Sequence, residues 1–66
     1  MGQPVKKKEI MYDLLWIVNG RVKEVVMVNK PRYTCVWKAN TIKGTTHRMG
    51  LLQPRRIDLR PKGGWR

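Results

Sequence analysis

Residues 10–28 read IMYDLLWIVNGRVKEVVMV, and this stretch decides the fold. Its first half is dense in apolar and aromatic residues, and its second half is rich in β-branched residues with polar interruptions. Between the halves lies Asn19-Gly20, which suits a two-residue type I′ turn because both central positions of that turn need a positive φ. The stretch therefore predicts a β-hairpin.

The turn sets the expected pairing of the two hairpin strands. On one face the pattern pairs Val18–Arg21, Trp16–Lys23, Leu14–Val25 and Tyr12–Met27. On the other face it pairs Ile17–Val22, Leu15–Glu24, Asp13–Val26 and Met11–Val28. The first face carries both aromatic residues and two cations, whereas the second carries both acids. The pattern therefore favours neither face as the buried one.

Residues 31–44 carry helix signals at both ends. Pro31 fits the first helical position and Gly44 fits the position that ends a helix. The spacing gives one apolar face, formed by Cys35, Val36, Ala39 and Ile42. Tyr33 and Trp37 are expected to flank this face, with Trp37 serving mainly as a core residue. A third strand is the alternative, because several residues of the segment are β-branched.

Residues 49–59 predict a last extended segment. Pro54 cannot donate a hydrogen bond within a sheet, so this strand is expected to be short, bulged or at an edge. The elements together indicate an α+β fold, a small ββαβ domain. It has a three-stranded, mainly antiparallel sheet with one helix packed on a face, and flexible basic tails.

The chain of 66 residues divides into three parts. Residues 1–8 are expected to form a basic N-terminal tail, residues 9–59 a single folded domain, and residues 60–66 a basic C-terminal tail. Neither end offers a periodic apolar face to bury. A domain of this size buries only about 60% of its unfolded surface, which excludes a multi-domain enzyme and a deep substrate cavity.

Charge is the strongest functional signal. Fifteen Lys and Arg residues against four Asp and Glu residues give a formal net charge of +11. Solubility needs a net charge of only about 2–8 in a small domain. The excess predicts a nucleic-acid partner, RNA or DNA, whose phosphates release counterions when the protein binds. An acidic protein or membrane surface is the alternative partner.

The residues expected to contact phosphates are Lys6, Lys7, Lys8, Arg21, Lys23, Arg48, Arg55 and Arg56. Arg55-Arg56 can clamp phosphates, or its charges can protect an exposed strand edge from aggregation. Tyr12 and Trp16 are candidates for base stacking if their face is exposed, and core residues otherwise.

Catalysis and metal binding lack the residues they need. Cys35 and His47 form the only pair of nucleophile and base in the chain, and Cys35 lies on the expected apolar face, where a thiol is inert. One Cys and one His do not supply a tetrahedral zinc site. We therefore expect a non-enzymatic protein with no metal and no cofactor. No motif of a known nucleic-acid-binding family is present.

The sequence thus predicts a small nucleic-acid-binding protein that contacts the phosphate backbone through dispersed Lys and Arg. The alternative is an interaction module or regulator, of the kind encoded by phages and mobile elements, docking on an acidic partner surface. A component of a larger ribonucleoprotein or virion is a third interpretation. Glu9 and Asp13 interrupt any secretory signal, and no apolar run reaches membrane-spanning length, so a cytoplasmic or nucleoid-associated location is expected.

Overall fold

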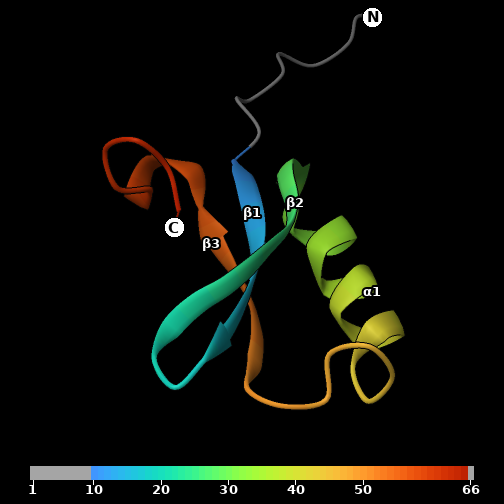
Figure 1. Cartoon of the computed structure of the whole chain (residues 1–66). Helices are drawn as coiled ribbons and strands as arrows, with labels where there is room; N and C mark the ends of the chain where they lie inside the picture. The colour runs from blue at the N-terminus through green and yellow to red at the C-terminus, as the bar shows by residue number, and fades with distance from the viewer. Residues whose placement is uncertain (1–9, 66) are drawn as a thin grey trace, which may run out of the picture.

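A computed structural model of the protein describes residues 10–65 (Figure 1). Its elements follow in the order β1 Met11–Val18, β2 Arg21–Pro31, α1 Arg32–Ile42, β3 Leu51–Arg56 and the short 3-10 helix η1 Ile57–Leu59. The strands form one antiparallel sheet in the order β2-β1-β3, and α1 packs on it. The predicted ββαβ order is confirmed, and the alternative of a strand over residues 31–44 is wrong.

The hairpin turn has the predicted geometry. Asn19 and Gly20 have φ values of 55° and 76°, as a type I′ turn requires. Val18 lies opposite Arg21 and Ile17 opposite Val22, as the turn predicts. The hairpin is therefore specified by this local signal.

Beyond the first two pairs, the predicted register is wrong. Trp16 lies opposite Glu24 instead of Lys23, because β2 contains three irregularities that each add a residue. For this reason β2 has eleven residues and β1 has eight. At the last irregularity Asn29 has a φ of 56°, and its backbone N–H donates to the carboxylate of Asp13. The bulge is thus stabilised by a side chain on the neighbouring strand.

The two faces of the sheet are covered by different parts of the chain. Leu14 and Trp16 lie on the face that packs against α1, where the Cys35 thiol meets the backbone carbonyl of Tyr12 at 3.8 Å. Leu15 lies on the opposite face, beside Trp65. Leu14, Leu15 and Cys35 are fully buried, and Figure 1 shows α1 on one side of the sheet only.

The helix begins and ends close to the predicted positions. Pro31 precedes its first residue, and Gly44, with a φ of 83°, lies two residues beyond its last. Cys35 points into the core, whereas Trp37 does not. Within residues 10–65, no helix is both long enough and apolar enough to cross a membrane.

The last strand is shorter than the predicted extended segment. β3 ends at Arg56, and the chain then tightens into η1. β3 pairs only with β1, so Pro54 lies in an edge strand as expected. Just before β3, Gly50 has a φ of 79°, and a Cβ atom there would overlap the carbonyl oxygen of Ile17. The close approach of the loop to β1 therefore requires glycine.

The segment after η1 differs from the basic tail expected over residues 60–66. Arg60 and Trp65 both bind the carboxylate of Asp13, 47 and 52 residues away in sequence. These polar contacts hold the segment on the sheet, although the segment has no periodic apolar face to bury. The expected N-terminal tail, with Lys6, Lys7 and Lys8, lies outside the described residues.

Candidate nucleic-acid interface

The cations of the hairpin lie at its turn end. Arg21 and Lys23 are both exposed. The ammonium of Lys23 lies 5.7 Å from the ring centroid of Trp16, within the range of a cation–π interaction. Lys23 lies at the first irregularity of β2, between the residues that pair with Ile17 and Trp16. It therefore stays near the Trp16 ring although it is not the residue opposite Trp16.

Trp16 is held by contacts within the protein. Its ring meets the imidazole of His47 edge to face, with centroids 4.4 Å apart, and its indole N–H donates to the carbonyl of Met49. His47 is itself fixed by Thr46 at 2.7 Å and by Glu24 at 2.8 Å. These contacts favour packing over base stacking as the role of Trp16. Tyr12, the other stacking candidate, is half-buried.

The Arg55-Arg56 pair is divided between the two faces of β3. Arg55 donates to the side-chain oxygen of Gln53 at 2.9 Å, on the face opposite α1. Arg56 forms a 2.7 Å ion pair with Asp58. Neighbouring residues of a strand point to opposite faces, so the two guanidinium groups do not form the joint phosphate clamp that the sequence suggests.

Arg48 lies in the loop between α1 and β3. Its Nε donates to the carbonyl of Gly44 at 3.2 Å, which leaves its two terminal amino groups without a protein partner in the described residues. The side chain borders a cleft of about 250 Å³ between the end of α1 and the start of β3. The same cleft is lined by Asn40 and Lys43. Two cations therefore face one small polar cavity.

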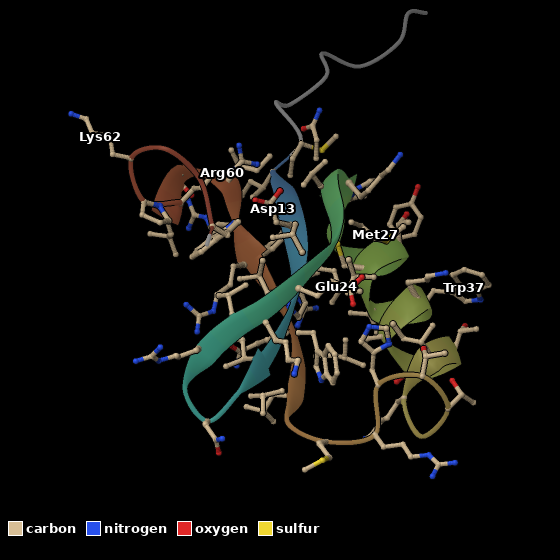
Figure 2. The ribbon with its side chains drawn as sticks, in the orientation of Figure 1. Asp13, Glu24, Met27, Trp37, Arg60 and Lys62 are labelled. Carbon is tan, nitrogen blue, oxygen red and sulfur yellow. The ribbon has the colours of Figure 1, made fainter. Side chains whose placement is uncertain are left out.

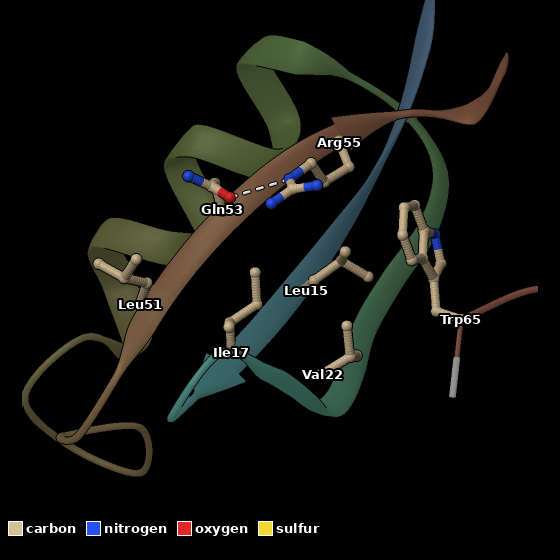
Figure 3. A pocket seen from close by; sticks show the side chains of 8 residues that line it. Leu15, Ile17, Val22, Leu51, Gln53, Arg55 and Trp65 are labelled. Atoms are coloured by element: carbon tan, nitrogen blue, oxygen red, sulfur yellow. Dashed lines mark hydrogen bonds between the residues drawn. The ribbon is translucent and has the colours of Figure 1, made fainter. Parts of the chain in front are cut away.

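The sheet face opposite α1 carries a second, more apolar groove of about 410 Å³ (Figure 3). Its floor is aliphatic, and Trp65 forms one wall in Figure 3. The labelled lining residues are Leu15, Ile17, Val22, Leu51, Gln53, Arg55 and Trp65. Arg55 is the cation of this groove.

A buried carboxylate that the sequence did not single out organises the C-terminal segment. Asp13 is fully buried and receives two hydrogen bonds from Arg60, at 2.7 and 2.8 Å, and one from the Trp65 indole at 2.6 Å. The backbone N–H of Asn29 donates the fourth bond. Figure 2 shows Arg60 and Asp13 close together at one end of the sheet. We refer to these groups as the Asp13 network.

The Asp13 network keeps the carboxylate ionised. Burial raises the pKa of Asp13, but the hydrogen bonds from Arg60, Asn29 and Trp65 and the charge of Arg60 more than offset this effect, so the pKa lies below its usual value. Four donors occupy both oxygen atoms of the group. The network therefore has a structural role, joining the C-terminal segment to β1 and β2.

The sequence pattern also did not indicate the two most exposed aromatic residues as candidate binding residues. Tyr33 is 74% exposed and Trp37 is 64% exposed, both on α1. Successive helical residues are about 100° apart, which places Trp37 about 200° from Cys35 and so on the opposite side of the helix. The expectation that Trp37 fills the core is therefore wrong. The helical periodicity of the sequence contains the signal that would have placed it correctly.

All three acids within residues 10–65 have a basic partner. Asp13 pairs with Arg60, Asp58 with Arg56, and Glu24 with His47. The cations of this part of the chain that form no salt bridge are Arg21, Lys23, Lys30, Arg32, Lys38, Lys43, Arg48, Arg55 and Lys62. The described surface therefore carries an excess of positive charge that its own acids do not neutralise.

The described residues form neither a nucleophile–base pair nor a metal cluster. The Cys35 thiol contacts a backbone carbonyl, and both ring nitrogens of His47 are bound to Thr46 and Glu24. Burial and the charge of Asp13 raise the pKa of Cys35. Within residues 10–65, no three His, Cys, Asp or Glu side chains are grouped to hold a metal ion.

Comparisons with models of known protein families, with curated protein sequences and with solved structures found no match to this chain.

Proposed function

We propose that this protein is a small, non-enzymatic nucleic-acid-binding protein that contacts the phosphate backbone through its Lys and Arg side chains. The observation that carries the proposal is the pairing of the acids. Asp13, Glu24 and Asp58 are each held by a basic group, and nine Lys and Arg side chains of the described residues form no salt bridge. A polyanion supplies the charge that these side chains lack.

The distribution of these cations favours backbone contact over the reading of a base sequence. They lie at the hairpin turn, along α1, in the cleft after α1 and on β3. No single cluster presents the convergent side chains that distinguish one base pair from another. Contacts of this kind position a protein on nucleic acid and make its affinity depend on salt.

Binding to labelled RNA and DNA strands at two salt concentrations tests the proposal. If four phosphates are contacted, the affinity falls about 50-fold for a single strand and about 150-fold for duplex DNA between about 50 mM and about 200 mM salt. The double substitution Arg21→Gln/Lys23→Gln removes two exposed cations and reduces the slope of log affinity against log salt by up to about two. The control Leu59→Gln alters an exposed side chain on η1 without changing charge, so we expect the slope of the parent protein.

Absence of binding at about 50 mM salt would contradict the proposal, as would an affinity that does not change with salt. Fluorescence anisotropy measures both quantities directly.

The groove on the sheet face opposite α1 favours a second candidate, an interaction module for an acidic protein segment. Its aliphatic floor suits apolar side chains, and Arg55 can pair with a carboxylate. This function predicts a partner that remains bound after nuclease treatment and is released by Leu51→Asp, which places a charge in the lining of the groove. Loss of the partner on nuclease treatment would favour nucleic acid instead.

A further inference from the structure

Two large aromatic side chains point into solvent from α1. Tyr33 and Trp37 are 74% and 64% exposed and lie one helical turn apart. Figure 2 shows Trp37 extending away from the sheet. Single exposed apolar residues are common, but two large exposed rings one turn apart on the same helix face are not a usual surface feature. The buried core of the described residues is small, yet these two large rings do not contribute to it and remain exposed to solvent.

The residues that flank these rings in the sequence are basic. Lys30 and Arg32 precede Tyr33 in the chain, and Lys38 follows Trp37. None of these three cations forms a salt bridge with an acid of residues 10–65, and α1 contains no acidic residue. An apolar surface with this charge favours an anionic ligand that also has flat apolar groups.

A basic cleft lies next to the aromatic pair. Asn40, one turn after Trp37, lines the 250 Å³ cleft between α1 and β3 together with Lys43 and Arg48. The bond from Arg48 to Gly44 orients the guanidinium group and leaves its terminal amino groups available. A phosphate in this cleft would meet two cations.

We propose that the exposed face of α1 binds single-stranded nucleic acid, with bases stacked on Tyr33 and Trp37 and a backbone phosphate in the cleft at Lys43 and Arg48. This inference rests on the proposed function and specifies the form of nucleic acid. Bases of a single strand expose their flat faces to aromatic side chains, whereas bases of a duplex already stack on one another. The aromatic pair therefore discriminates single strands from duplexes.

Substitution of Trp37 tests the inference. We expect Trp37→Ala to weaken binding to a labelled single strand of thymidylates about 5- to 150-fold, the range for loss of one stacked base. Trp37→Phe retains a ring and restores part of the affinity. Affinity for a duplex of matched length stays at the value of the parent protein in both variants. The control Leu59→Ala removes an exposed apolar side chain outside α1 and leaves both affinities unchanged.

The cleft is tested separately. Lys43→Gln and Arg48→Gln each reduce the salt dependence of single-strand binding by about one phosphate contact. Because Trp37, Lys43 and Arg48 are exposed or border solvent, the variants are expected to keep the fold. Circular dichroism confirms this before affinities are compared.

The outcomes separate this inference from the proposed function. If the parent protein binds single strands with a steep salt dependence but Trp37→Ala binds equally well, the stacking surface is wrong and the proposed function stands. If Trp37→Ala weakens single-strand and duplex binding equally, the specificity for single strands is wrong. If the parent protein binds no nucleic acid at about 50 mM salt, both proposals fail.

Discussion

Replacing Asp13 with Asn perturbs the Asp13 network at its centre. The substitution preserves size but leaves one acceptor oxygen where the carboxylate has two. Four donors meet the carboxylate, namely two from Arg60, one from Trp65 and the backbone N–H of Asn29. In Asp13→Asn, the amide NH₂ group faces donors instead of accepting from them. The guanidinium of Arg60 also loses the negative charge of its ion-pair partner.

The expected loss in the free energy of unfolding follows from the burial of Asp13 and Arg60. Removing one member of a buried ion pair costs about 3–5 kcal/mol. The Asp13 side chain is 0% exposed, but that of Arg60 is 33% exposed and regains hydration in the variant. We therefore expect Asp13→Asn to lower the free energy of unfolding by about 2–3 kcal/mol, a smaller loss than for a fully buried pair. A domain of this length has about 3–10 kcal/mol in total.

Urea denaturation followed by circular dichroism measures this loss. The matched control is Asp58→Asn, which removes the same charge from the exposed pair between Arg56 and Asp58. That pair has side chains 46% and 60% exposed, so its loss costs less than about 1 kcal/mol. Equal destabilisation by the two substitutions would refute the argument that burial gives the Asp13 network its strength.

Low pH is expected to reduce the free energy of unfolding of the parent protein. Burial raises the pKa of Asp13, but hydrogen bonds bring it below its usual value, so this stabilisation is full above about pH 4 and declines as the pH falls through the folded-state pKa. Urea titrations at several pH values reveal the decline, and Asp13→Asn is expected to lack this contribution. Gly50→Ala forces a Cβ against β1, whereas Gly44→Ala meets open space at a similar positive φ and costs about 1–2 kcal/mol. Thermal melts should show a substantially larger loss for Gly50→Ala, and equal losses would contradict the close approach. Burial raises the pKa of Cys35, so a thiol reagent reacts with it only in urea; rapid labelling of the native protein would disprove this burial.

The hairpin and the helix could be predicted because their signals are local. Asn19-Gly20 specifies the turn, and Pro31 and Gly44 mark the ends of the helical segment. The register beyond Ile17 could not be extrapolated from the turn, because the turn residues carry no signal for the three irregularities of β2. The last of these irregularities is stabilised by the bond from Asn29 to the carboxylate on β1.

The candidate site was predictable only in part. The charge excess follows from composition, and the orientation of Trp37 follows from helical periodicity once Cys35 is placed in the core. The division of Arg55 and Arg56 between two faces follows from the alternation of a strand. In contrast, no sequence pattern links Trp65 to Asp13, because 52 residues separate them and the contact is a single polar bond.

The Asp13 network also determines the order in which parts of the fold can form during synthesis on the ribosome. Asp13 emerges early, but Arg60 and Trp65 are added 47 and 52 residues later. At about 5–20 residues per second, the interval to Trp65 lasts roughly 3–10 seconds. During it the carboxylate lacks the donors that allow its burial, so β1 can pair with β2 while the sheet face around Asp13 stays hydrated. Burial of the Asp13 carboxylate therefore waits until Arg60 and Trp65 have been synthesised.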